Sequence, residues 1–204
     1  LWMLIGVGTG LVAAVNAGRW PDRLLTGLAL VGYSLPVFFI GLLMLVFIVI
    51  RWHWLPYPHY SSVLHDPVGW LQTMLLPWVA LAIVFAAFYT RLVRSEVLTA
   101  LNSDYIRTAR AVGVPQRVVV RKHALRAGLT PVVTAAGMDL AGVLGGAVIT
   151  EAVFNLPGLG RLAVSSVVEY DLPVITAVTL VAAAFVIVAN LVVDILYAAI
   201  DPRV

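Results

Sequence analysis

The residues of this chain that could do chemistry are concentrated in one basic segment. Eight of its thirteen Lys and Arg residues lie between positions 91 and 126. A segment of this kind can bind anionic lipid headgroups or present a charged surface to a soluble partner. The sequence of the segment leaves both interpretations open. The eight residues are Arg91, Arg94, Arg107, Arg110, Arg117, Arg121, Lys122 and Arg126.

Other reactive groups are sparse. The absence of cysteine excludes disulfides, thiolate chemistry and Cys-ligated metals. Ser34 does not lie in a G-x-S-x-G motif, so serine hydrolysis is not expected. No G-x-x-x-x-G-K-[ST] motif is present, so the chain cannot bind a nucleotide phosphate by that route. The histidines have no spacing typical of a metal site and are interpreted as loop residues: His53, His59, His65 and His123.

The composition indicates that a lipid bilayer surrounds most of the chain. It is 62% hydrophobic and only 11% charged, far from the balance of a soluble domain. Helices are expected because every backbone polar group in lipid must be bonded internally. The chain begins inside an apolar run, so we expect an upstream span to be missing. The predicted fold is an all-α, polytopic bundle with five spans, at 1–17, 24–50, 71–89, 127–150 and 174–199.

The loop charges predict the orientation of these spans. Arg19, Arg23, Arg203 and the eight basic residues of the 91–126 segment fall on one side, against Arg51 and Arg161 on the other. The positive-inside rule therefore places the 91–126 loop in the cytoplasm. The loops at 51–70 and 151–173 then face outward. Aromatic residues of the first outward loop are expected to anchor it at the membrane interface rather than to stack sugars or bases: Trp52, Trp54, Tyr57, Tyr60 and Trp70.

The cytoplasmic loop contains signals for two helices. Ser103 is a suitable cap for a helix over 104–112, which starts with an acidic residue as the helix dipole prefers. Gly113 is a natural stop, and Pro115 prevents simple continuation. A second helix over 116–128 should lead into the fourth span. The pattern predicts a short rigid helix, held by two longer ones, that can transmit displacement from a soluble partner.

Two stretches of this loop resemble a known family. Residues 104–113 read Asp-Tyr-Ile-Arg-Thr-Ala-Arg-Ala-x-Gly, and residues 121–133 read Arg-Lys-His-Ala-Leu-Arg-x-x-Leu-x-Pro-Val-Val. Both are similar to the signature loop of ABC-transporter permeases of the dipeptide/oligopeptide/nickel branch, most closely the subunit usually encoded first of the pair. Arg107 and Arg126 depart from the general family pattern, which has Glu and Pro there. Further similar segments lie at 20–25, 34–38, 151–161 and 190–203.

The resemblance implies a fold, a function and a set of partners. The chain would be one transmembrane permease domain over 1–204, of the type I ABC importer kind, in the bacterial cytoplasmic membrane. It would pair with a second permease, two ATP-binding subunits and an extracytoplasmic substrate-binding protein in a peptide importer. It would not be an enzyme by itself and would bind no cofactor, because ATP and Mg²⁺ belong to the partners. The implied contact to the ATPase comprises Asp104, Tyr105, Arg107, Thr108, Ala109, Arg110, Ala111 and Gly113.

Four residues are candidates for the transport pathway or its gate. Asp139 lies near the middle of a predicted span, where a carboxylate is costly and tends to face a cavity or a partner. A proton-coupled secondary transporter that uses Asp139 is therefore the alternative function. Asp194 lies nearer the cytoplasmic end and is the weaker candidate. In the turn-rich 151–161 loop, Glu151, Phe154 and Asn155 are candidates for an external gate, with a plain surface turn as the alternative.

Two glycine pairs in the predicted spans have G-x-x-x-G spacing. Gly6 and Gly10 lie in the first span, and Gly142 and Gly146 lie in the fourth. Such pairs let helix backbones approach closely, so we expect them to serve helix packing rather than bending at a gate.

Overall fold

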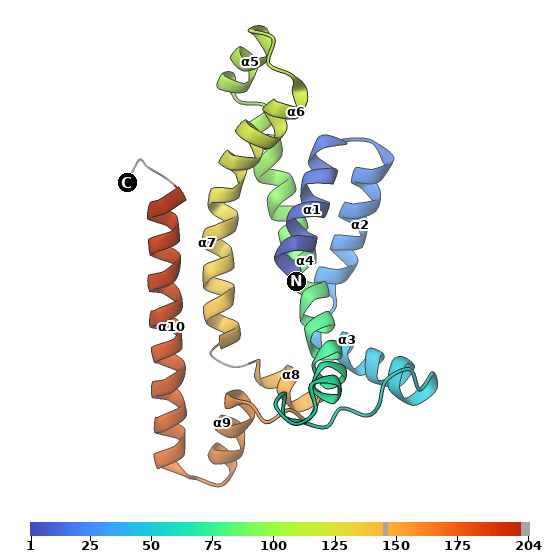
Figure 1. The fold of residues 1–204 in the computed structure, drawn as a ribbon, viewed down its shortest axis with the longest axis vertical. Helices are drawn as coiled ribbons and strands as arrows, with labels where there is room; N and C mark the ends of the chain where they lie inside the picture. The colour runs from blue at the N-terminus through green and yellow to red at the C-terminus, as the bar shows by residue number, and fades with distance from the viewer. Residues whose placement is uncertain (145–146, 201–204) are drawn as a thin grey trace. The chain divides into compact units, whose positions relative to one another are not determined.

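Helices account for every regular element in the part of the chain that the computed structural model describes, residues 1–144 and 147–200 (Figure 1). Within this part, the side chains at 141, 144, 193–194 and 196–200 are not described. The all-α prediction is confirmed. In chain order the elements are α1 (Trp2–Val15), α2 (Trp20–Ser34), α3 (Val37–Met44), the π-helix η1 (Leu45–Arg51), α4 (Pro67–Leu101), α5 (Asp104–Ala111), α6 (Gln116–Val118), the π-helix η2 (Val119–Ala124), α7 (Leu125–Leu144), α8 (Val148–Val153), α9 (Leu159–Val168) and α10 (Leu172–Ile200).

The chain divides into two compact units. Unit 1 comprises Leu1–Ser34, Ile83–Ala136 and Val193–Val204, and unit 2 comprises Leu35–Ala82 and Gly137–Val192. The long helices α4, α7 and α10 each contribute to both units. The predicted cytoplasmic loop lies in unit 1, and the candidate gate loop at 151–161 lies in unit 2. A single permease domain over 1–204 stays a prediction.

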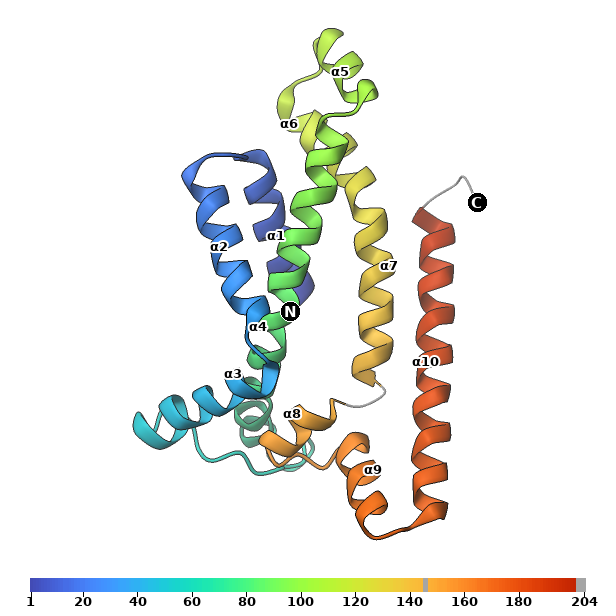
Figure 2. The same ribbon diagram turned by 180° about the vertical axis from the view of Figure 1, so that it is seen from behind.

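In unit 1, α1 lies directly against α4 (Figure 2). Gly6 and Gly10 are both buried in this contact. A Cβ atom added at Gly10 would lie 2.7 Å from the carbonyl oxygen of Thr90, which is too close for any larger residue. The hydroxyl groups of Thr9 and Thr90 are 2.7 Å apart across the same contact. These two glycines therefore allow close helix packing, as expected from their spacing.

In unit 2, α3 packs against α8. The ring of Phe154 would lie only 3.1 Å from a Cβ added at Gly41, which is a tight contact, and its side chain is almost fully buried. The connection between η1 and α4, residues 52–66, is tied to the N-terminal part of α4 because Thr73 donates a hydrogen bond of 2.8 Å to the carbonyl oxygen of His59. Phe154 is thus a packing residue of unit 2.

The predicted count of five spans is not confirmed. Among the described residues, α4 and residues Leu172–Val192 of α10 are long and apolar enough to cross a membrane. The predicted span at 24–50 is not one straight helix, because it breaks into α2 and the α3–η1 segment, a bent pair that could form a third span. Pro36 explains the break, since proline lacks an N–H and disfavours helical geometry in the residue before it.

The predicted first and fourth spans also differ from the helices of the structure. Only 14 residues form α1, which is short for a bilayer. The predicted fourth span, 127–150, is divided between α7 and α8, and Gly146 of its glycine pair lies outside the described residues. Gly142 has no neighbour within 4 Å of an added Cβ, so its predicted packing role finds no contact in the part described.

Candidate functional site

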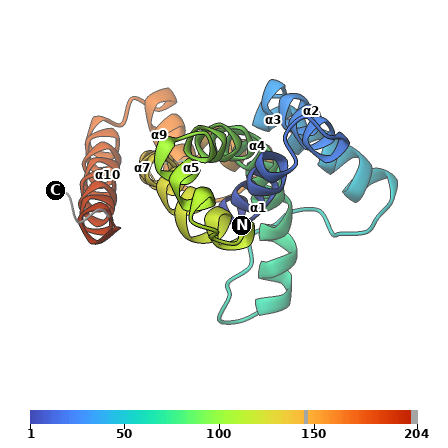
Figure 3. The same cartoon turned by 90° about the horizontal axis from the view of Figure 1, so that it is seen from above.

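The candidate site is the short helix α5, which follows α4 and precedes α6 in the chain and is seen from above in Figure 3. Residues 91–101 of the predicted loop are helical and form the last turns of α4. The observed limits of α5, Asp104–Ala111, agree with the predicted helix at 104–112. All eight residues implied for docking lie on α5 or in the turn that follows it.

Ser103 occupies the N-cap position, as predicted, but its side chain does not cap α5. The backbone at Ser103 is extended, which is usual for a residue that precedes a helix. The hydroxyl group instead donates a hydrogen bond to the carbonyl oxygen of Ala100. The last carbonyl groups of a helix have no partner within it, so Ser103 stabilises the end of α4 rather than the start of α5. The predicted capping of α5 by the Ser103 side chain is therefore wrong.

The C-terminal end of α5 is a Schellman motif, which fixes the direction of the chain beyond it. Gly113 has φ +83°, the left-handed conformation that glycine adopts at little cost. Its N–H donates to the carbonyl oxygen of Arg110 at 3.0 Å, and the N–H of Val114 donates to that of Ala109 at 3.1 Å. The predicted stop at Gly113 is confirmed.

One apolar side chain fixes α5 to the rest of unit 1. Ile106 has 0% exposure and packs in a cluster that includes Leu101 of α4 and Val119, Val120 and Ala124 of η2. Sequence reasoning did not identify Ile106 as an anchor. The available signal was an isolated β-branched apolar residue in an otherwise polar helix.

Around this anchor, the rest of the surface of α5 is open and carries two arginines. Of the eight candidates, Ala109 is half-buried and the others are exposed. Arg107 lies 3.5 Å from Asp104, but the two side chains are 73% and 97% exposed, so this pair contributes little to stability. Arg110 donates to the side-chain oxygen of Gln116 at 3.3 Å, across the turn. The guanidinium groups therefore remain available to a partner.

The second helix predicted at 116–128 is present as α6, η2 and the start of α7. Its middle part, Val119–Ala124, is π-helical, which no sequence feature predicted. Single π-helical turns within α-helices often occur at functional sites. Here the π-helical turn supplies the apolar residues against which Ile106 packs.

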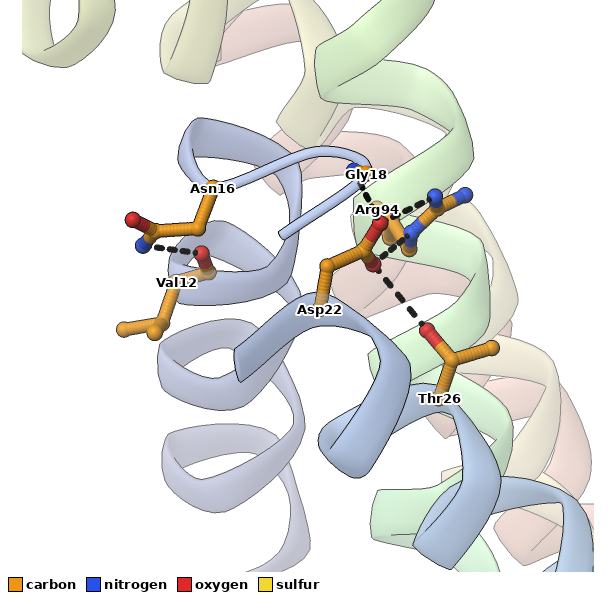
Figure 4. A network of polar contacts seen from close by, with 6 residues as sticks. All are labelled: Val12, Asn16, Gly18, Asp22, Thr26 and Arg94. Carbon is orange, nitrogen blue, oxygen red and sulfur yellow. Dashed lines mark hydrogen bonds and ion pairs between the residues drawn. The ribbon is translucent and has the colours of Figure 1, made fainter. Parts of the chain in front are cut away.

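An ion pair with a buried carboxylate, which sequence reasoning missed, joins α2 to α4 in the same unit (Figure 4). The carboxylate of Asp22, at the start of α2, accepts hydrogen bonds from the Nε and Nη2 atoms of Arg94, the latter at 2.8 Å. It also accepts bonds from the backbone N–H of Gly18 at 2.8 Å and the hydroxyl of Thr26 at 3.2 Å. The available signal was the acidic residue in the first turn of an apolar helix, because a buried charge needs a partner.

The pathway candidates occupy different environments in unit 2. The Glu151 carboxylate accepts the backbone N–H of Arg161 at 2.8 Å, in the first turn of α9, where the helix dipole favours an anion. The Arg161 side chain also donates to Asn155, which is exposed and has φ +52°. The structure thus brings Glu151 and Asn155 together, whereas Phe154 packs on α3. Asp139 is half-buried and engaged in an interaction, and the Asp194 side chain lies outside the described part.

Metal coordination finds no candidate in the described residues, where no three His, Cys, Asp or Glu side chains lie close enough to share an ion. His53, His59 and His65 lie in the connection between η1 and α4, as predicted, whereas His123 lies in η2, so its interpretation as a loop residue is wrong. The exposed basic residues of α5 remain the main candidate site.

Comparison with known proteins places the chain among transport proteins. Residues 6–204 match the family described as binding-protein-dependent transport system inner membrane component. The chain is 38% identical over 204 residues to the probable peptide ABC transporter permease protein y4tP of Sinorhizobium fredii, and it covers 65% of that protein. It is 43% identical over 205 residues to the glutathione transport system permease protein GsiC of Escherichia coli K12, of which it covers 64%.

The match to GsiC of Salmonella paratyphi A has the same identity and coverage. In all three comparisons the whole of this chain is aligned, and it spans less than two thirds of the relative's length. The chain belongs to the family of inner membrane components of binding-protein-dependent transport systems.

Proposed function

We propose that this chain is a permease subunit of an ATP-driven peptide importer in the bacterial cytoplasmic membrane. Membership of the family supports a membrane role, and the names of the relatives specify peptide and glutathione transport. The partners would be a second permease, two ATP-binding subunits that hold ATP and Mg²⁺, and an external binding protein that delivers the substrate. No observation favours the proton-coupled alternative.

The observation that carries this proposal is that α5 is anchored by one buried residue while its other side chains are largely exposed. Ile106 holds one side in the core of unit 1, while Tyr105, Arg107 and Arg110 are exposed on the helix. A helix with this division can dock on a soluble subunit without losing its attachment to the membrane part. Its exposed residues then form the docking surface, and Ile106 passes the displacement to α4 and η2.

The ends of α5 support the same role. The Schellman motif at Gly113 and the extended Ser103 leave little freedom for α5 to rotate independently of its neighbours. Because α4 precedes it and η2 leads directly into α7, a movement of α5 would act on two long helices at once. Closure of the ATP-binding subunits would in this way change the tilt of the helices that line the pathway.

The pathway and gate residues are proposed with separate roles. Asp139 would line the pathway, since it is a half-buried carboxylate within α7. Glu151 and Asn155 would hold the external loop in shape through their bonds to Arg161. Phe154 would link that loop to α3, so that the gate moves as part of unit 2.

The decisive experiment compares two charge-reversal variants in the reconstituted transporter. Arg107→Glu with Arg110→Glu reverses the proposed docking face, and Lys122→Glu with Arg126→Glu reverses two exposed cations outside α5. We expect the first variant to insert normally but to lose substrate uptake and co-purification of the ATP-binding subunits. The control should retain both. Normal uptake by the first variant, or equal loss in both, would contradict the docking role of α5.

A further inference from the structure

A groove of about 360 Å³ lies in unit 1 beside the candidate site, and the docking role of α5 does not use it. One wall is the C-terminal end of α1 and the other is α6 and η2. The α1 wall is apolar except for Asn16 at its end, whereas the opposite wall combines Val120 and Gln116 with two cations. The principal lining residues are Leu11, Val12, Val15, Arg117, Val120 and Arg121.

The charges of the groove have no acidic partner in the described part of the chain. Arg117 and Arg121 are both exposed, and neither belongs to either of the ion pairs found there. They are four residues apart on consecutive helical turns, so their side chains project to the same side. Two guanidinium groups above an apolar wall match a ligand with an anionic head and a hydrocarbon body.

The exposed surface of α1 continues the apolar wall away from the two arginines. Val15 and Val12 border the groove, and Ile5 and Leu4 are exposed further along the same helix. The direction agrees with the expected topology, in which Arg117 and Arg121 lie at the cytoplasmic interface and α1 runs into the bilayer. A lipid could therefore place its phosphate at the arginines and one acyl chain along α1.

We propose that this groove binds an anionic phospholipid. The phosphate lies between Arg117 and Arg121, and the upper part of an acyl chain packs on Val12 and Val15. The inference depends on the membrane placement in the proposed function, but not on the docking of α5. It separates the basic segment into a protein-binding face on α5 and a lipid-binding groove behind it.

The strength of the proposed interaction sets the scale of the test. A Lys or Arg near an anionic membrane surface contributes a gain in affinity of about fivefold. Loss of both arginines should therefore weaken binding by roughly 25-fold if the two contributions add. A general attraction to the whole basic segment would instead be reduced equally by removing any two of its cations.

The experiment titrates the full-length protein in detergent micelles with dioleoyl phosphatidylglycerol and counts bound lipid by native mass spectrometry. Dioleoyl phosphatidylcholine is the zwitterionic comparison. We expect preferential binding of one phosphatidylglycerol, roughly 25-fold weaker in Arg117→Gln with Arg121→Gln. Lys122→Gln with Arg126→Gln is the matched control, with the same spacing and charge loss outside the groove, and should change affinity less than about twofold.

Two further arms test the occupant and the groove itself. Val12→Trp should fill the groove and weaken phosphatidylglycerol binding while both arginines remain. Glycerol phosphate should fail to compete, because it lacks the acyl chain. The proposal would be overturned if the groove variant and the control variant lost affinity equally. Full competition by glycerol phosphate, or unchanged binding in Arg117→Gln with Arg121→Gln, would also overturn it. A failure of α5 docking would leave all of these lipid measurements unchanged.

Discussion

Asp22 and Arg94 form one ion pair, but removing Arg94 should destabilise the protein more than removing Asp22. The Asp22 side chain is 5% exposed and that of Arg94 is 30% exposed. Arg94→Ala leaves a buried carboxylate with only Gly18 and Thr26 as donors. We expect this change to lower the free energy of unfolding by about 3–5 kcal/mol, the range for removing one partner of a buried pair.

Replacing Asp22 should lower the free energy of unfolding by less than replacing Arg94, although Asp22 makes more hydrogen bonds. Asp22→Ala leaves a guanidinium group that is already in partial contact with solvent and can be hydrated. Gly18, which loses its acceptor, is exposed and can bond to water. We therefore expect a loss of about 1.5–3 kcal/mol, the usual contribution of a hydrogen bond between charged groups.

The assay is reversible unfolding in mixed detergent and dodecyl sulfate micelles, followed by far-UV circular dichroism. A double-mutant cycle of Asp22→Asn and Arg94→Gln measures the coupling, which should exceed about 1 kcal/mol. The same cycle at Asp104 and Arg107 is the control, because that pair is exposed and should couple by less than about 0.5 kcal/mol. Additive effects at the first pair, or a larger loss in Asp22→Ala than in Arg94→Ala, would refute the reasoning.

Two glycines and one glutamate give further tests, by the same unfolding assay or by hydrogen exchange. Gly10→Val should disrupt α1 packing and lower the unfolding midpoint, because its side chain would meet Thr90, whereas Gly8→Val, on an open face of the same helix, should have little effect. Gly113→Ala should accelerate amide exchange in α5, since a left-handed conformation costs about 1–2 kcal/mol for alanine while no neighbour obstructs the new methyl group. Glu151→Gln should weaken protection at the start of α9 by about 0.3–1 kcal/mol, and unchanged exchange there would argue against the dipole interaction.

The limits of α5 could be predicted because its signals are local. An acidic first residue marks its start, and the end requires glycine at one position, Gly113, where the backbone is left-handed. Each of these features depends on neighbours within a few residues. The anchor Ile106 was harder to find, because its burial depends on η2, and η2 has no distinctive sequence pattern.

The spans were harder to predict because the apolar composition of a segment does not show at which residue its helix breaks. Residues 24–50 are uniformly uncharged, so hydropathy treats them as one segment, yet the backbone restriction at Pro36 divides them. The ion pair of Asp22 with Arg94 joins residues 72 positions apart. Periodicity within one helix carries no information about such a contact. Glu151 was predicted to belong to a gate loop. Its hydrogen bond to the first turn of α9 could not be predicted, because it depends on how the backbone folds between residues 151 and 161.

The basic segment is a single feature in the sequence but not in the structure. Arg94 is paired with Asp22 inside unit 1, Arg107 and Arg110 lie on the open face of α5, and Arg117 and Arg121 line the groove beside α1. A net charge cannot distinguish these environments, whereas the loss of each cation should produce a different defect. Arg94 should affect folding, the α5 pair should affect coupling to ATP-binding subunits, and the groove pair should affect lipid selectivity. This separation is a stronger test than overall activity, because a uniformly basic loop would give the same defect at every position.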